Sequence, residues 1–123
     1  MAKINFAIMG AGNIARYMAE TVTKMDTVEA YAVASRDIKR AQGLGDKYGF
    51  SKAYGSYEEM ISDPNVDLVY IATPHSHHAR HMIQCLEGGK HVLCEKAFTV
   101  TAEEAKSVLS LAKEKGLLVA EAI

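Results

Sequence analysis

The chain has 123 residues, of which 49% are hydrophobic and 24% are charged, and its formal net charge at pH 7 is −1. This length fits one domain with a core of its own, and the near-zero charge gives no reason to expect nucleic acid or an anionic membrane as the main partner. No apolar stretch approaches the roughly 20 residues that span a bilayer. The N-terminus has the pattern of a first strand, without the apolar region of a secretion signal.

The two cysteines, Cys85 and Cys94, both lie in apolar segments. Two cysteines are too few for a disulfide framework, so we expect reduced, buried thiols in a cytoplasmic protein. The sequence contains no low-complexity segment, linker or repeat, and residues 1–123 are therefore expected to form one domain.

Strand-like and helix-like segments alternate through the first half of the chain. Apolar runs predict strands at 4–9, 28–34 and around 53–54, and helical spacing predicts helices at 13–25, at 37–48 and, briefly, from 57 onward. Asp37 and Gly49 are residue types that begin and end helices, and Ser56 begins a capping-box pattern. Gly43 and Gly45 each weaken the helix at 37–48 by about 1 kcal/mol relative to alanine.

The second half continues the alternation, with strands predicted at 68–72, 91–94 and 117–120 and a helix at 76–87. Thr101 begins a second capping box, and the helix after it ends at Gly116. The apolar face of that helix is predicted to hold Ala105, Val108, Leu109 and Ala112. This order predicts an α/β fold, a doubly wound parallel sheet covered on both faces with right-handed crossovers. The expected strand order is that of the Rossmann fold, 3-2-1-4-5-6.

Gly10, Gly12 and Ala15 lie between the first predicted strand and the first helix. Gly10 permits a tight turn, Gly12 lets the backbone approach a pyrophosphate, and Ala15 lets the helix pack closely on the strand. The first-turn N–H groups, at Asn13 and Ile14, would then face the phosphates. An ordinary tight turn is the alternative, but the strand–turn–helix context favours dinucleotide binding.

The end of the second predicted strand indicates which dinucleotide is bound. NAD enzymes commonly have Asp or Glu there, whereas this chain has Ser35, Arg36 and Asp37. Arg36 suits a ribose 2′-phosphate and can stack on adenine, Ser35 adds a hydroxyl, and Asp37 is better placed as a helix cap. Arg36 as an ordinary surface charge is the alternative. The pattern favours NADP(H) over NAD(H).

Glu95 and Lys96 follow the fifth predicted strand, at the edge of the sheet where doubly wound folds bind ligands. A lysine there can donate to a substrate hydroxyl or carbonyl and, if partly desolvated, exchange a proton. Glu95 can accept from the ribose hydroxyls at the nicotinamide end. A surface ion pair is the alternative for this dipeptide.

Four histidines between His75 and His81 raise the question of a metal site. His77 and His81 are one helical turn apart, but the pattern places both on the polar flank of the helix, with no carboxylate or thiol to complete a site. His78 lies at the margin of the apolar face. We therefore expect no metal site, and we expect His75, directly after a strand end, to face the cofactor.

These segments together resemble the glucose–fructose oxidoreductase/inositol dehydrogenase family, Gfo/Idh/MocA, over essentially the whole chain. The matching segments are residues 10–15, 34–37, 71–75 with His78, and 89–96, of which the last is the most specific. Residues 53–59 and the Cys85–Leu86 pair are most similar to the dihydrodiol and xylose dehydrogenase branch, which uses NADP.

The resemblance implies the Rossmann domain of an oxidoreductase that moves a hydride between nicotinamide and a sugar, cyclitol or related alcohol. The family's lysine corresponds to Lys96, which would hold and polarise the reacting hydroxyl, and the glutamate before it corresponds to Glu95. Thr73 and Pro74 correspond to a turn that lines the cofactor. Glu121 corresponds to a glutamate near the nicotinamide end.

Two features depart from the family pattern. Ala97 stands where the family usually has proline, which restores an N–H and loosens the backbone after the lysine. The family's C-terminal substrate domain, with its acid–base pair, is absent from these 123 residues. We therefore expect the cofactor domain of a longer enzyme, which binds its cofactor alone but does not turn over. Surface that the missing part would cover can promote self-association.

Two other hypotheses remain open at this point. One is a stand-alone dinucleotide-binding sensor or regulatory module, in which Lys96 is dispensable. The other is a Rossmann-like fold that has lost its ligand because the side chain of Asn13 or Ile14 blocks the pocket.

Overall fold

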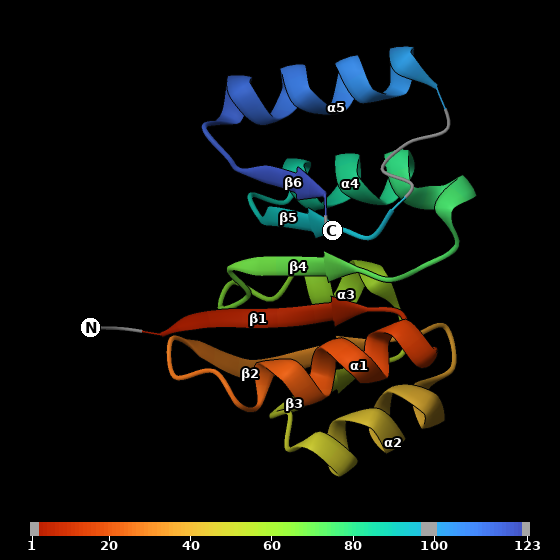
Figure 1. Ribbon diagram of the computed structural model, residues 1–123, viewed down its shortest axis with the longest axis vertical. Helices are drawn as coiled ribbons and strands as arrows, with labels where there is room; N and C mark the ends of the chain where they lie inside the picture. The colour runs from red at the N-terminus through yellow and green to blue at the C-terminus, as the bar shows by residue number, and fades with distance from the viewer. Residues whose placement is uncertain (1–2, 97–100, 122–123) are drawn as a thin grey trace.

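The computed structural model describes residues 3–96 and 101–121, and it shows a parallel six-stranded sheet in the order β3-β2-β1-β4-β5-β6 (Figure 1). The strands are β1 (Ile4–Met9), β2 (Val28–Ala34), β3 (Lys52–Tyr54), β4 (Leu68–Ile71), β5 (His91–Cys94) and β6 (Val119–Glu121). The helices are α1 (Asn13–Val22), α2 (Ile38–Tyr48), α3 (Tyr57–Ile61), α4 (His78–Glu87) and α5 (Ala102–Lys115), with a 3₁₀ turn at His75–His77 before α4. The predicted fold class and strand order are confirmed.

The helices divide between the two faces of the sheet. Figure 1 shows α1 and α2 in front of the half formed by β1, β2 and β3, while α3 and α4 lie behind the sheet. Among the described residues, no helix covers the front of β4, β5 and β6, so the expectation of full cover on both faces holds only for the first half. None of the described helices is both long and apolar enough to cross a membrane.

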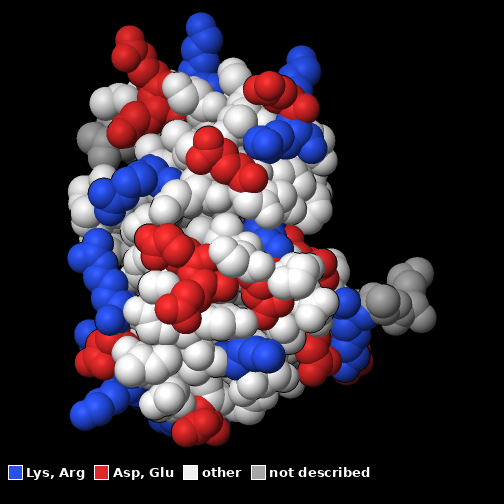
Figure 2. Space-filling model, turned by 180° about the vertical axis from the view of Figure 1, so that it is seen from behind, with Lys and Arg blue, Asp and Glu red and all other residues white. Residues whose placement is uncertain are grey.

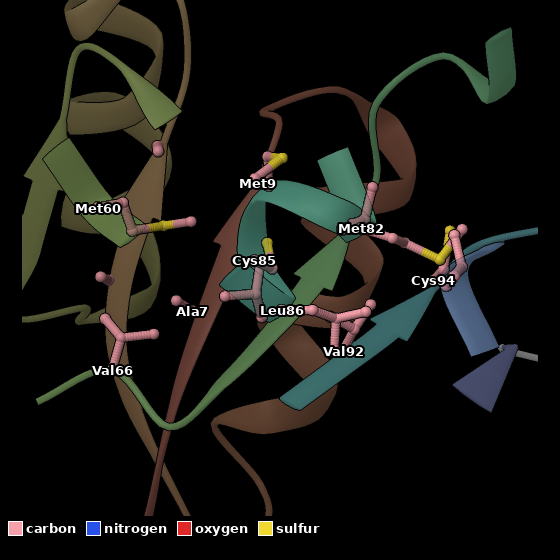
Figure 3. Packing of buried hydrophobic residues seen from close by; sticks show 14 of the residues in the cluster. Ala7, Met9, Met60, Val66, Met82, Cys85, Leu86, Val92 and Cys94 are labelled. Carbon is pink, nitrogen blue, oxygen red and sulfur yellow. The ribbon is translucent and has the colours of Figure 1, made fainter. Parts of the chain in front are cut away.

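The larger hydrophobic cluster lies between the sheet and α3, α4 and α5. In Figure 3, side chains of α4 pack over those of strands β1 and β5. The buried residues labelled there are Ala7, Met9, Met60, Val66, Met82, Cys85, Leu86, Val92 and Cys94. Cys85 and Cys94 are free and buried, as predicted, and burial raises the pKa of each thiol to about 12.

Most helix ends follow the capping residues read from the sequence. Asp37 accepts from the Lys39 N–H, and Gly49 ends α2 in the left-handed conformation. Ser56 accepts from the Glu59 N–H at the start of α3. Both reciprocal bonds of the predicted capping box at Thr101 are present, and Gly116 ends α5. Local side-chain chemistry therefore sets these boundaries.

Other predicted boundaries were wrong by a few residues. α1 ends at Val22 and not at residue 25, because the N–H groups of Lys24 and Met25 donate to carbonyls three residues back and not four, as an α-helix requires. β4 ends at Ile71, and β6 begins at Val119. Leu109 is 52% exposed and does not share the buried face of α5, because it lies about 100° around the helix from the buried Val108.

A buried polar cluster connects the sheet to the segment after α3. The Asp63 carboxylate accepts from the Tyr31 and Tyr54 hydroxyls, at 2.8 and 2.6 Å, and from the Asn65 N–H at 2.9 Å. The buried Lys90 ammonium donates to the Asp63 carbonyl at 2.8 Å. Burial alone would raise the pKa of the Asp63 carboxyl, but the donated hydrogen bonds outweigh it and hold that pKa below its ordinary value. The same cluster raises the pKa of Tyr54 to about 12.

Asp63→Asn is expected to lower the free energy of unfolding by about 1–2 kcal/mol near pH 7, because the two tyrosine hydroxyls lose a charged acceptor. The folded-state pKa of Asp63 is depressed, so its contribution is complete above the ordinary value of 3.8 and is lost as pH falls below that value. Urea unfolding at pH 7 and near pH 3 measures both effects. A gap between wild type and variant that is as large near pH 3 as at pH 7 would contradict the assignment.

Candidate functional site

The turn after β1 has the geometry that the glycine pattern predicts. Gly10 has φ +109°, and its N–H donates to the Ala34 carbonyl at the end of β2. A Cβ on Gly10 would lie 2.9 Å from the Ala72 carbonyl oxygen, closer than such contacts occur. Gly10 is therefore required by the fold itself, because the turn passes directly against the chain that leaves β4.

Gly12 is constrained differently. It is the N-cap of α1 with an ordinary φ of −87°, and a Cβ built there meets no atom within 4 Å. The space beside Gly12 is thus open, and the first-turn N–H groups of α1 adjoin it without a capping side chain. An open space at a helix N-terminus of this kind fits the pyrophosphate of a dinucleotide.

A cavity of about 340 Å³ joins this turn to the ends of β2 and β4. Six predicted site residues line it, namely Gly10, Gly12, Ser35, Arg36, Thr73 and Pro74. Asn13 and Ile14 are exposed and are not among its lining residues. Neither side chain blocks the cavity. Blockage by Asn13 or Ile14 therefore does not support the hypothesis of a Rossmann-like fold that has lost its ligand.

The β2 end of the cavity carries two arginines. Ser35 is buried, and its hydroxyl oxygen accepts from the Asp37 N–H at 3.2 Å, while Asp37 itself caps α2 as expected. Arg36 and Arg40 both line the cavity, and no Asp or Glu does so among the described residues. Figure 2, the view from behind, shows Lys and Arg side chains along the edge at which the strands end.

The β4 end is held by histidines of α4. The Thr73 hydroxyl hydrogen-bonds to Nδ1 of His81 at 2.8 Å, and Nε2 of His78 donates to the Thr73 carbonyl at 2.7 Å. The prediction that His81 lies on a polar flank was wrong, because His81 is only 2% exposed. The chain after β4 covers that flank. The side chain of His75, predicted to face the cofactor, lies outside the part that the structure describes.

No group of three or more metal-binding side chains occurs within residues 3–96 and 101–121. His77 is instead hydrogen-bonded to Arg80, at 3.0 Å, and its ring lies 5.7 Å from that of His81. His77 and His81 line the cavity, and His78 holds the turn after β4 through the Thr73 carbonyl.

Glu95, Lys96 and Glu121 lie at the ends of β5 and β6 and do not line this cavity. The Tyr70 hydroxyl donates to one oxygen of the Glu95 carboxylate, and burial together with this bond raises the pKa of Tyr70. Lys96 is exposed, and Glu121 pairs in register with Cys94. Ala97, the departure from the family pattern, lies outside the described residues.

Besides Ala11 and Ala72, four residues line the cavity that the sequence analysis did not assign to the site, and they are Arg40, Tyr57, His77 and His81. The sequence could have indicated Arg40 as a site residue, because it lies four residues after Arg36 and in the first turn of the helix that Asp37 caps. No local pattern indicated Tyr57, since its position depends on how α3 packs. Its ring meets that of His81 edge-on, with centroids 5.1 Å apart.

Comparison with known protein families identifies the family of this chain. Residues 4–122 match the model of the Gfo/Idh/MocA family, described as the oxidoreductase family with an NAD-binding Rossmann fold. The chain belongs to this family. The Gfo/Idh/MocA assignment accounts for the glycine turn, the strand order and the position of the cavity together.

Curated relatives of this Gfo/Idh/MocA chain include enzymes of the branch that the motifs indicated. The chain is 43% identical over 119 residues to a D-xylose 1-dehydrogenase (NADP(+)) from Hypocrea jecorina. This alignment covers 97% of this chain and 28% of that enzyme. It is 40% identical over 122 residues to a trans-1,2-dihydrobenzene-1,2-diol dehydrogenase from Mus musculus, covering 98% of this chain and 37% of that enzyme. The chain thus spans about a third of the length of these relatives.

Solved structures agree with the fold. KijD10, a 3-ketoreductase from Actinomadura kijaniata in complex with NADP and TDP-benzene, superposes with a TM-score of 0.95 at 30% identity, covering 98% of this chain and 37% of that one. An NAD-binding oxidoreductase from Klebsiella pneumoniae superposes with a TM-score of 0.91 at 29% identity, covering 99% and 35%. These neighbours carry the same Rossmann domain within longer chains.

Proposed function

We propose that the chain is the NADP(H)-binding domain of a dehydrogenase that acts on a sugar, cyclitol or related alcohol by hydride transfer. One observation carries the choice of cofactor. A single cavity joins the glycine turn to Arg36 and Arg40, and no carboxylate lines it within the described residues. Arginines suit a 2′-phosphate, whereas a ribose 2′-hydroxyl is usually held by Asp or Glu.

Each wall of the cavity has a distinct part in this proposal. Gly12 and the first turn of α1 hold the pyrophosphate through backbone N–H groups. Arg36 and Arg40 hold the 2′-phosphate, with Ser35 beside them. The bound nicotinamide would supply or accept the hydride. Two relatives are a xylose dehydrogenase and a dihydrodiol dehydrogenase, which supports a substrate that reacts at a carbon bearing a hydroxyl group.

Residues at the ends of β5 and β6 serve the reacting end. Lys96 holds and polarises the substrate hydroxyl, and its exposure leaves the ammonium accessible to a ligand. One oxygen of the Glu95 carboxylate accepts from the Tyr70 hydroxyl, which orients the carboxylate. The other oxygen is left to accept from a ribose hydroxyl. Glu121, at the end of β6, adjoins this edge.

Lys96→Met tests the catalytic part in a protein that joins this domain to a substrate domain. We expect kcat to fall by about 10²–10⁴-fold, the usual effect of removing a positioned proton donor, while the Kd for NADP⁺ changes less than about threefold. Lys113→Met, a surface change on α5, is the control. A variant with full turnover would show that Lys96 has no part in the catalytic step.

The isolated 123-residue chain is expected to bind NADP⁺ and to show no dehydrogenase activity, because catalysis also needs a positioned substrate and a proton acceptor. Steady-state assays of NADPH formation with a panel of sugars and polyols measure this. Turnover by the isolated chain would contradict the proposal that this domain binds the cofactor and that catalysis also requires a substrate domain.

A further inference from the structure

His81 occupies a position that the cofactor-domain pattern did not assign. It is 2% exposed, yet it lines two neighbouring cavities, the one beside the glycine turn and a second one of about 440 Å³. Arg36 and Tyr57 are shared by both cavities as well. These three side chains therefore form the wall between the two spaces, next to the predicted site of the adenosine.

The hydrogen bonds around Thr73 define which nitrogen of His81 can meet a ligand. Nδ1 is engaged by the Thr73 hydroxyl, and no partner of Nε2 occurs among the described residues. The direction of the bond between the Thr73 hydroxyl and Nδ1 of His81 depends on the tautomer of the ring, and we take the arrangement in which the hydroxyl donates. In this arrangement the Thr73 hydroxyl donates and Nε2 of His81 carries the ring proton.

The ring is neutral at physiological pH. Burial is the largest cause of a His81 pKa lowered to about 4, and the nearby charges of Arg80, His77, Arg36 and His78 lower it further. With one proton, and with Nδ1 accepting from Thr73, the ring offers a single N–H donor. It is also part of an aromatic wall, since it packs edge-on against Tyr57 at 5.1 Å.

We propose that His81 is an adenine-reading residue, whose Nε2–H donates to an acceptor nitrogen on the Watson–Crick edge of the cofactor's adenine. The base would lie between the Tyr57–His81 wall and Arg36, a setting that suits a planar ring with acceptor nitrogens. Thr73 is then a positioning residue that fixes the His81 tautomer. This inference rests on the proposed NADP(H) function and names the part of the site that selects the base.

The test compares NADP⁺ with its hypoxanthine analogue, nicotinamide hypoxanthine dinucleotide phosphate, in which N1 carries a proton and no longer accepts. Calorimetric titration of the wild-type chain is expected to show about tenfold weaker binding of the analogue. His81→Leu should lose about tenfold in affinity for NADP⁺ and bind both dinucleotides equally. His81→Gln should keep most of the preference, because its amide nitrogen donates from a similar distance.

His91→Gln, a histidine that accepts from the Leu118 N–H elsewhere on the sheet, is the control and should behave as wild type. If His81→Leu does not fold, Thr73→Val carries the comparison, since it keeps the ring but removes the group that fixes its tautomer; it should lower the preference. Equal wild-type binding of both dinucleotides, or an unchanged preference in either variant, would overturn the role of His81 and leave NADP(H) binding intact. Failure of the wild type to bind NADP⁺ would overturn both.

Discussion

Gly12→Ala is expected to lower the affinity for NADP⁺ by about 100-fold or more while leaving the domain folded. The backbone φ of −87° suits alanine, and the added Cβ meets no protein atom within 4 Å, so the free energy of unfolding should change by no more than about 1 kcal/mol. The same Cβ would occupy the space through which the pyrophosphate approaches the N–H groups of α1. Losing two charge-assisted hydrogen bonds accounts for an effect of this size.

Gly10→Ala is the matched control, because it is the same change two residues earlier. Gly10 has φ +109° and only 2.9 Å between a built Cβ and the Ala72 carbonyl oxygen. This variant should lose about 3 kcal/mol or more of stability whether or not cofactor is present. Thermal unfolding and NADP⁺ titration of both variants separate the two roles. Equal binding by wild type and folded Gly12→Ala would show that the pyrophosphate does not bind at this turn.

Arg36→Ala is expected to weaken NADP⁺ binding by about 10- to 100-fold, because a 2′-phosphate loses a charge-assisted partner. NAD⁺ affinity should fall less than NADP⁺ affinity, since NAD⁺ lacks that phosphate and loses only the stacking of Arg36 on adenine. Arg40→Ala should act in the same direction, as Arg40 lines the same cavity. Lys39→Ala removes a charge from α2 without touching the cavity lining and serves as the control.

Titrations of NADP⁺ and NAD⁺ at two salt concentrations measure these effects. Added salt should reduce the advantage of NADP⁺ in wild type and matter less in Arg36→Ala, since exposed charges are screened. If Arg36→Ala retains the wild-type affinity for NADP⁺, the arginine is an ordinary surface charge and the choice of cofactor must be explained by other residues.

Much of the fold followed from local sequence rules. The alternation of buried strands with capped helices predicted the class and the strand order, because right-handed crossovers leave few arrangements for parallel strands. The glycine turn was also predictable, since its residues act within six positions of one another. The capping residues Asp37, Ser56 and Thr101 worked as expected because a cap contacts N–H groups two or three residues away.

Contacts between distant segments were not predictable in this way. Helical spacing placed His81 on a polar flank, but only the packed structure shows that Thr73 and Tyr57 cover that flank. Asp63 lies 32 residues from Tyr31 and 27 from Lys90, and no local pattern links them. A helical period gives the direction of a side chain on its own helix, and it does not tell which neighbouring segment meets it.

The central claim is that this domain binds NADP(H) in the cavity between the glycine turn and Arg36. Calorimetric titration of the 123-residue chain with NADP⁺ and with NAD⁺, after circular dichroism has shown that it is folded, tests that claim directly. The account predicts saturable one-to-one binding that favours NADP⁺. A folded chain that binds neither dinucleotide, or that prefers NAD⁺, would contradict it.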